Sequence, residues 1–139
     1  MSQWLRAAGL AAAVLMIPLP GISAAEATCK VGSEECPRDL VFHRGEITVT
    51  GVGTVTGKEP VYYFRFNADK GQMATIHIVS GHGLKTGPGI PFTYQGGGDA
   101  FDVDTPMALP VTGPYVLAIN ANLMSEGPFG PFRFTLTIK

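Results

Sequence analysis

The three histidines are the first residues to examine for chemistry, because imidazole is a common general base and metal ligand. They are His43, His77 and His82, and their spacing differs from the compact His-x3-His pattern of zinc sites. Only Gly81 separates Ser80 from His82, but a nucleophile and its base meet in space, and the chain has no Gly-x-Ser-x-Gly elbow. We therefore expect surface histidines, no metal site and no serine hydrolase.

Acidic side chains are concentrated in residues 96–104, whose sequence is Gly-Gly-Gly-Asp-Ala-Phe-Asp-Val-Asp. Asp99, Asp102 and Asp104 offer the hard oxygen ligands that calcium prefers, but the glycine and glutamate of the twelve-residue calcium loop are missing. We expect a solvated polar loop, with calcium binding as the alternative. A carboxylate pair for glycoside hydrolysis would also need a sugar cleft. No catalytic residue and no cofactor are therefore predicted, and the protein is not expected to be an enzyme.

Cys29 and Cys36 are the only two cysteines, with six residues between them. Both follow the export signal described below, so both are expected to reach an oxidising compartment. Closing so short a ring stabilises a fold by about 2–3 kcal/mol in the chain-entropy model. A lipid anchor on Cys29 is the alternative, but it requires an aliphatic residue where the chain has Glu26. We predict a Cys29–Cys36 disulfide.

The first 27 residues have the order of a cleavable export signal. An uncharged apolar run occupies residues 7–17 and ends at Pro18, and small residues follow at 23–27. A bilayer span needs about 20 apolar residues, which makes a membrane anchor the weaker alternative. Cleavage after Ala25 and cleavage after Ala27 both fit. We expect a periplasmic or secreted protein without a membrane span.

Residues 28–139 predict a single all-β domain, because no helical apolar period occurs there and several runs alternate apolar and polar residues. The clear runs are 61–66, 73–79, 115–119 and 132–139, and weaker ones are 40–42, 46–52 and 90–94. Gly51, Gly53 and Gly57 are interpreted as bulges or bends in a strand. The pattern predicts a small antiparallel β-sandwich, jelly-roll-like, of about seven or eight short strands.

The formal net charge of −1 lacks the basic excess that binding to a phosphate backbone requires. Nucleic acid is therefore not an expected partner.

In strand order, the chain resembles the periplasmic inhibitors of goose-type lysozyme from about residue 42 to residue 139. The likeness depends on the aromatic run and turn at 61–72, Gly-Pro-Gly-Ile at 87–90, Leu-Pro-Val-Thr-Gly-Pro-Tyr at 109–115, and the final Ile-Lys. The aromatic strand, the turn and the return strand are also similar to pre-peptidase C-terminal-like sandwiches, which are accessory domains.

The resemblance implies a non-catalytic protein that blocks the lysozyme cleft with loops at one end of the sandwich. Phe129 lies in a rigid Gly-Pro-Phe-Gly-Pro tip that suits a protein anchor, although packing onto the core is the alternative. The candidate partner-binding residues are Pro88, Tyr94, Asn120, Asn122, Ser125 and Phe129.

The chain departs from the family in the loop at 120–131, which has Glu126 where basic side chains are expected. Neutral donors form weaker hydrogen bonds than charged ones, so we expect weak inhibition with little salt dependence. Tight inhibition that is lost at high salt would instead indicate that a charged residue such as Lys85 or Arg133 makes the contact. The alternative function is an accessory module that binds another envelope protein or a glycan.

Overall fold

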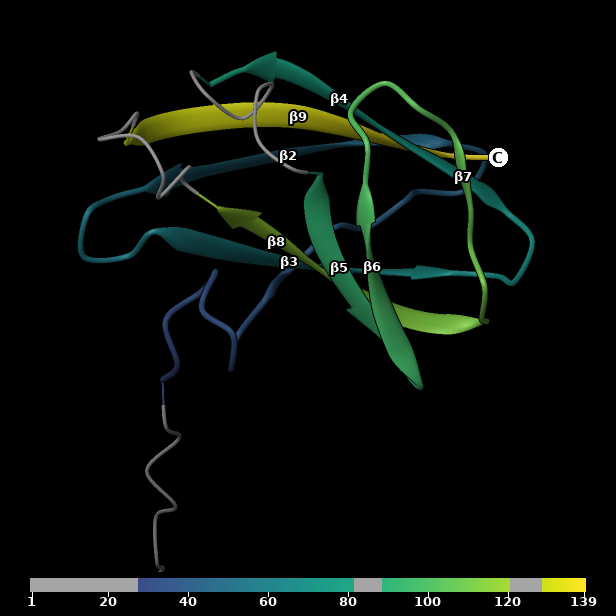
Figure 1. Ribbon diagram of the computed structural model, residues 1–139, viewed down its shortest axis with the longest axis horizontal. Helices are drawn as coiled ribbons and strands as arrows, with labels where there is room; N and C mark the ends of the chain where they lie inside the picture. The colour runs from purple at the N-terminus through teal and green to yellow at the C-terminus, as the bar shows by residue number, and fades with distance from the viewer. Residues whose placement is uncertain (1–27, 82–88, 121–128) are drawn as a thin grey trace, which may run out of the picture.

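A computed structural model describes residues 28–81, 89–120 and 129–139, and these residues form an all-β sandwich (Figure 1). The nine described strands are β1 (Arg38–Asp39), β2 (Thr48–Val55), β3 (Val61–Ala68), β4 (Met73–Ser80), β5 (Ile90–Tyr94), β6 (Gly97–Phe101), β7 (Met107–Ala108), β8 (Gly113–Asn120) and β9 (Gly130–Ile138). The described residues contain no helix that could cross a membrane. The predicted all-β sandwich is confirmed.

The strands form two sheets that pack face to face. The five-stranded sheet has the order β1-β3-β8-β5-β6, and the four-stranded sheet has the order β2-β9-β4-β7. Neighbouring strands are antiparallel except β1, which pairs in parallel with β3. The chain therefore crosses to the other sheet at every connection between consecutive strands except the one from β5 to β6.

The core lies between the sheets because each long strand turns alternate apolar side chains inward. On β9 these are Phe132, Phe134, Leu136 and Ile138, all buried, as the alternation predicted. The rings of Phe64 and Phe134 meet edge to face across the two sheets, with centroids 5.1 Å apart. Burying one side chain of this size stabilises the fold by about 1.5–3 kcal/mol.

Four details differ from the sequence expectations. Residues 40–42 form no strand, because Leu40 is buried where the chain leaves β1 to cross to the other sheet. Residues 97–101 form β6, not a loop, because the turn at Gln95 and Gly96 folds them back on β5. With the short strands β1 and β7, the described residues form nine strands and not seven or eight. The parallel β1–β3 pair was also not expected.

The expected bulges at the glycines of β2 are wrong, since β2 pairs with β9 in unbroken register from Thr48 to Val55. Gly51 and Gly53 are needed because aromatic rings fill the space of their missing side chains. A Cβ on Gly51 would lie 2.2 Å from Cζ of Phe134, and one on Gly53 would lie 2.6 Å from Cζ of Phe132. The bulge that does occur lies in β4, between Ile78 and Ser80.

Five strand termini meet at one end of the sandwich, which we call the loop end. Here β2 ends at Val55, β3 begins at Val61, β4 ends at Ser80, β8 ends at Asn120 and β9 begins at Gly130. Figure 1 shows these termini together on the left of the molecule. Strand ends from both sheets are therefore presented on one side, as a binding end requires.

Candidate functional site

A groove of about 600 Å³ opens at the loop end, where the outer face of the four-stranded sheet reaches Ser80 and Phe129. We call it the arginine groove, because Arg38 and Arg133 both line it. Thr54 of β2 and Pro131 of β9 also line it. The groove thus combines cationic, hydroxyl and aromatic side chains.

The strand pattern explains why Arg133 faces outward. Its neighbours Phe132 and Phe134 are buried in the core, so the residue between them must point to solvent. Arg133 pairs with Val52 on one side and with Ser80 on the other, at the far side of the β4 bulge. The bulge therefore sets which β4 residue borders the guanidinium.

Arg38 reaches the groove from the other sheet. It belongs to β1, beside β3, and its Nη1 donates a hydrogen bond of 3.2 Å to the carbonyl oxygen of Val52 on β2. This contact closes the sandwich edge between the two sheets. Sequence reasoning missed Arg38 because its position depends on the crossover after β1, which no local pattern indicates.

The described lining of the arginine groove contains two guanidinium groups and no carboxylate. Arg133 forms no salt bridge with another described residue. Arginine presents a planar set of donors that matches a carboxylate in bidentate geometry. The groove is therefore suited to an acidic group, although the whole chain is nearly neutral.

Phe129 lies at the rim of the arginine groove with half of its surface exposed, 50%. Its ring approaches Gly57, where a Cβ would lie 3.8 Å from Cζ. Phe129 therefore does not fold into the core, and a partner could still cover its exposed half.

The other predicted partner-binding residues are divided by the fold. Asn120 is exposed at the loop end, where β8 finishes opposite Val61. Tyr94 is half-buried and pairs with Tyr115 of β8. Tyr115 precedes Asn120 by five residues, which is about 17 Å along an extended strand. The structure therefore separates Tyr94 from Asn120 and Phe129. Pro88, Asn122 and Ser125 lie outside the described residues.

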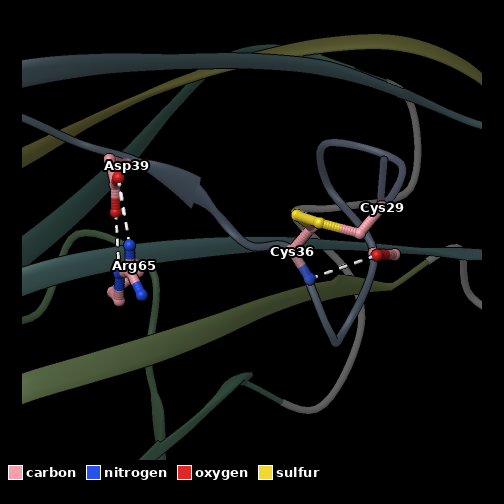
Figure 2. Close-up of a disulfide and its surroundings, with 5 residues drawn as sticks. Cys29, Cys36, Asp39 and Arg65 are labelled. Atoms are coloured by element: carbon pink, nitrogen blue, oxygen red, sulfur yellow. Dashed lines mark hydrogen bonds and ion pairs between the residues drawn. A yellow bond between two sulfur atoms is a disulfide. The ribbon is translucent and has the colours of Figure 1, made fainter. Parts of the chain in front are cut away.

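The predicted disulfide joins Cys29 and Cys36, whose Cα atoms are 5.8 Å apart (Figure 2). The loop that it closes is joined to the five-stranded sheet, because the N–H of Tyr63 donates to the carbonyl of Gly32 at 2.8 Å. Gly32 also lies against the ring of Tyr62, which leaves no room for a side chain there.

Figure 2 also shows the ion pair that links β1 to β3, in which Arg65 donates from Nε and Nη2 to the Asp39 carboxylate at 2.7 and 3.1 Å. These hydrogen bonds lower the pKa of Asp39 and raise the pKa of Arg65. Both groups are exposed, so the pair positions β1 more than it stabilises the fold.

The residues first considered for catalysis form separate contacts. His77 Nδ1 lies 2.6 Å from an oxygen of Asp104, on the exposed face of the four-stranded sheet. Asp99 accepts a hydrogen bond from the N–H of Ala100 at 2.8 Å. The described residues contain no group of three or more potential metal ligands. His82 lies outside the described residues.

Solved structures of three proteins share this sandwich. PliG of Salmonella Typhimurium, a periplasmic lysozyme inhibitor of g-type lysozyme, is 19% identical, with 73% of this chain and 96% of that chain covered and a TM-score of 0.55. A mutant of PliG from Escherichia coli has 20% identity, the same coverage and a TM-score of 0.55. PliG of Aeromonas hydrophila has 19% identity, coverage of 73% and 95%, and a TM-score of 0.52.

No protein-family model matches the sequence, and no curated protein matches it. The structural comparison agrees with the resemblance seen in the sequence and extends over most of the chain. The chain has the fold of the periplasmic inhibitors of g-type lysozyme.

Proposed function

We propose that the protein is a non-catalytic inhibitor of a g-type lysozyme and acts in the periplasm. The observation that carries this proposal is the arginine groove, where Arg38, Arg133 and Phe129 meet at the loop end and no carboxylate lies among the described lining residues. The shared fold of three lysozyme inhibitors supports the proposal. The signal-like first 27 residues are consistent with export.

Inhibition follows from complementary charge. Lysozymes cleave glycosidic bonds with carboxyl groups held in a cleft, so an inserted cation can pair with the group that the reaction needs. A guanidinium in a desolvated interface pairs with a carboxylate through charge-assisted hydrogen bonds. In this proposal Arg133 makes that contact and Arg38, held by Val52, borders it.

Phe129 contributes apolar contact area next to the charge. Its exposed half would lose its water on binding, and aromatic residues beside a charged contact are frequent anchors of protein interfaces. Asn120 lies at the same end and supplies a neutral amide. Tyr94 is left out of the proposed interface, because it lies toward the opposite end.

The experiment is a titration of purified g-type lysozyme with the processed protein. Residual activity should fall to near zero at about one molar equivalent if the protein blocks the cleft stoichiometrically. Phe129→Ala should weaken inhibition without loss of the folded state. Full activity at a large excess of the protein would refute the proposal and favour an accessory module that binds another envelope component.

A further inference from the structure

We propose that the protein has a second binding site, for a short neutral saccharide, under the disulfide loop. A cavity of about 570 Å³ lies there, within the range of small-ligand pockets of about 300–1,000 Å³. Its walls come from the disulfide loop at residues 30–34, the end of β2 and the start of β3. The proposal does not depend on lysozyme inhibition.

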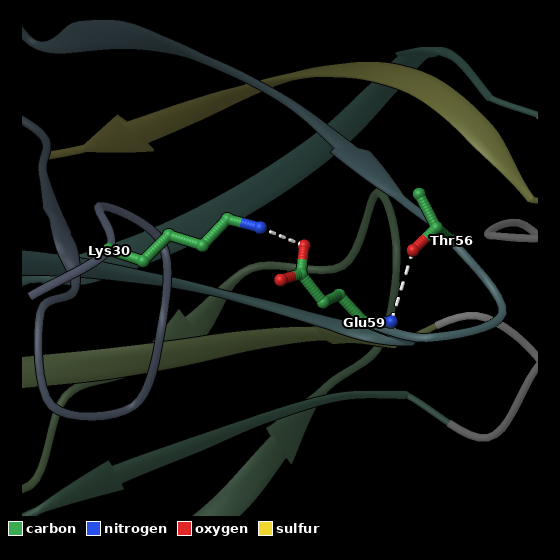
Figure 3. A network of polar contacts seen from close by, with 3 residues as sticks. All are labelled: Lys30, Thr56 and Glu59. Atoms are coloured by element: carbon green, nitrogen blue, oxygen red, sulfur yellow. Dashed lines mark hydrogen bonds and ion pairs between the residues drawn. The ribbon is translucent and has the colours of Figure 1, made fainter.

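Polar contacts already join the two sides of this cavity (Figure 3). Lys30, on the disulfide loop, forms an ion pair with Glu59, in the connection between β2 and β3. The backbone N–H of Glu59 also donates to the hydroxyl of Thr56 at 3.0 Å, which holds the backbone of Glu59 close to the end of β2. The cavity is therefore built by tertiary contacts and by the Cys29–Cys36 bridge.

The charge of the lining restricts the ligand. Two cations, Lys30 and Arg38, are balanced by two carboxylates, Glu34 and Glu59. A phosphate or another strong anion would meet the carboxylates, and a lipid chain would remove water from four charged groups. A neutral ligand with many hydrogen-bonding groups fits this balance.

An extended peptide is disfavoured because several backbone groups around the cavity are already paired. The carbonyl of Val52 accepts from Arg38, the N–H of Thr56 donates to the carbonyl of Glu59 at 2.9 Å, and the N–H of Tyr63 donates to Gly32. Strand addition needs free backbone donors and acceptors. The lining also offers side-chain donors and acceptors.

Those side chains suit a saccharide. Hydroxyls of Thr54 and Thr56 and the carboxylate of Glu59 can bond sugar hydroxyls, while the partly exposed Pro60 and Val61 can cover the carbon face of a sugar ring. A sugar presents both kinds of surface. The match of polar and apolar lining is the reason for choosing this class of ligand.

The test is a titration of the isotope-labelled protein with N,N′-diacetylchitobiose and, separately, with cellobiose, followed by amide chemical shifts. Saturable shifts are expected in residues 30–34 and 53–63 for at least one disaccharide. Glu59→Gln and Thr54→Val should each weaken binding about fivefold or more, as loss of one hydrogen bond predicts. The control variants Glu46→Gln and Thr50→Val make the same changes away from the cavity and should bind like the parent.

Dispersed amide spectra will establish that each variant is folded. If one of the two site variants does not fold, the other is sufficient for the test. Absence of saturable shifts with both disaccharides would overturn the proposal. Equal binding by the parent and both site variants would also overturn it. Failure of the disaccharide titration would not affect the proposal of lysozyme inhibition. Failure of the lysozyme titration would not affect the proposed saccharide site.

Discussion

Gly51 shows how one residue without a side chain determines the packing of β2 on the core. The ring of Phe134 occupies the space where a Cβ would stand, at 2.2 Å. Gly51→Ala should therefore force the ring or the strand to move and destabilise the protein by about 1–3 kcal/mol. Urea denaturation monitored by circular dichroism measures this loss.

Gly57→Ala is the matched control, because the nearest atom to its added Cβ would be the Phe129 ring at 3.8 Å, an ordinary contact. Its stability should equal that of the parent or exceed it by up to about 1 kcal/mol. Equal losses in the two variants would show that Phe134 does not pack on β2 as described.

Tyr115 is buried, and its hydroxyl forms hydrogen bonds with the backbone of Val111. The hydroxyl donates to the carbonyl of Val111 at 2.6 Å and accepts from the N–H of the same residue at 3.0 Å, which fixes the turn before β8. Tyr115→Phe should leave both backbone groups without a partner and cost about 1–3 kcal/mol. Thermal denaturation measures the loss.

Tyr94→Phe is the control, because it removes a phenolic hydroxyl from the neighbouring half-buried ring without touching Val111. Its stability should remain within about 0.5 kcal/mol of the parent. A large loss in Tyr94→Phe with none in Tyr115→Phe would contradict the assignment of the anchoring hydroxyl.

At the scale of elements, the disulfide loop is a structural part of the five-stranded sheet. Replacing both Cys29 and Cys36 by Ser should cost about 2–3 kcal/mol in the chain-entropy model. It should also accelerate hydrogen exchange of the Tyr63 amide, whose acceptor is Gly32 in that loop. Amide exchange followed by magnetic resonance compares Tyr63 with an amide of β9.

The bridge itself is tested by alkylation without reductant, which should label neither cysteine of the oxidised protein. Labelling of both cysteines would contradict the bridge. Unchanged exchange at Tyr63 in the serine variant would show that the loop keeps its position without the bridge.

How far the sequence predicts these elements depends on how local their causes are. The alternation in β3, β4, β8 and β9 is a local pattern, so their buried faces could be predicted residue by residue. The hairpin of β5 and β6 was only half predicted, because two glycines and Asp99 suggest a loop. There the pairing with β5 overrides the weak strand propensity of these residues.

The candidate site was less predictable than the fold, because its residues meet through long-range pairing. Asn120 and Phe129 could be assigned to loops near the last strand, and Arg133 to an outward position. Their meeting with Arg38 depends on the crossover from β1 to β2, which brings Arg38 to Val52. The position of Tyr94 beside Tyr115 could not be predicted either, because the long central segment gives no register.

At the scale of the whole molecule, charge is unevenly placed on a nearly neutral protein. The net charge of −1 predicts little steering of a partner, whereas the arginine groove concentrates two cations at the loop end. The expectation of little salt dependence was based only on the neutral loop at 120–131. With the groove at the same end, we now expect inhibition to weaken as ionic strength rises.

The most direct test compares Arg133→Gln with Arg44→Gln in the lysozyme titration at low and high salt. Both variants lose one exposed cation, but Arg44 lies in the turn before β2, at the end opposite the groove. Arg133→Gln should weaken inhibition about tenfold or more at low salt and remove much of its salt dependence, while Arg44→Gln should inhibit like the parent. Equal inhibition by the two variants, or none by the parent, would contradict the account.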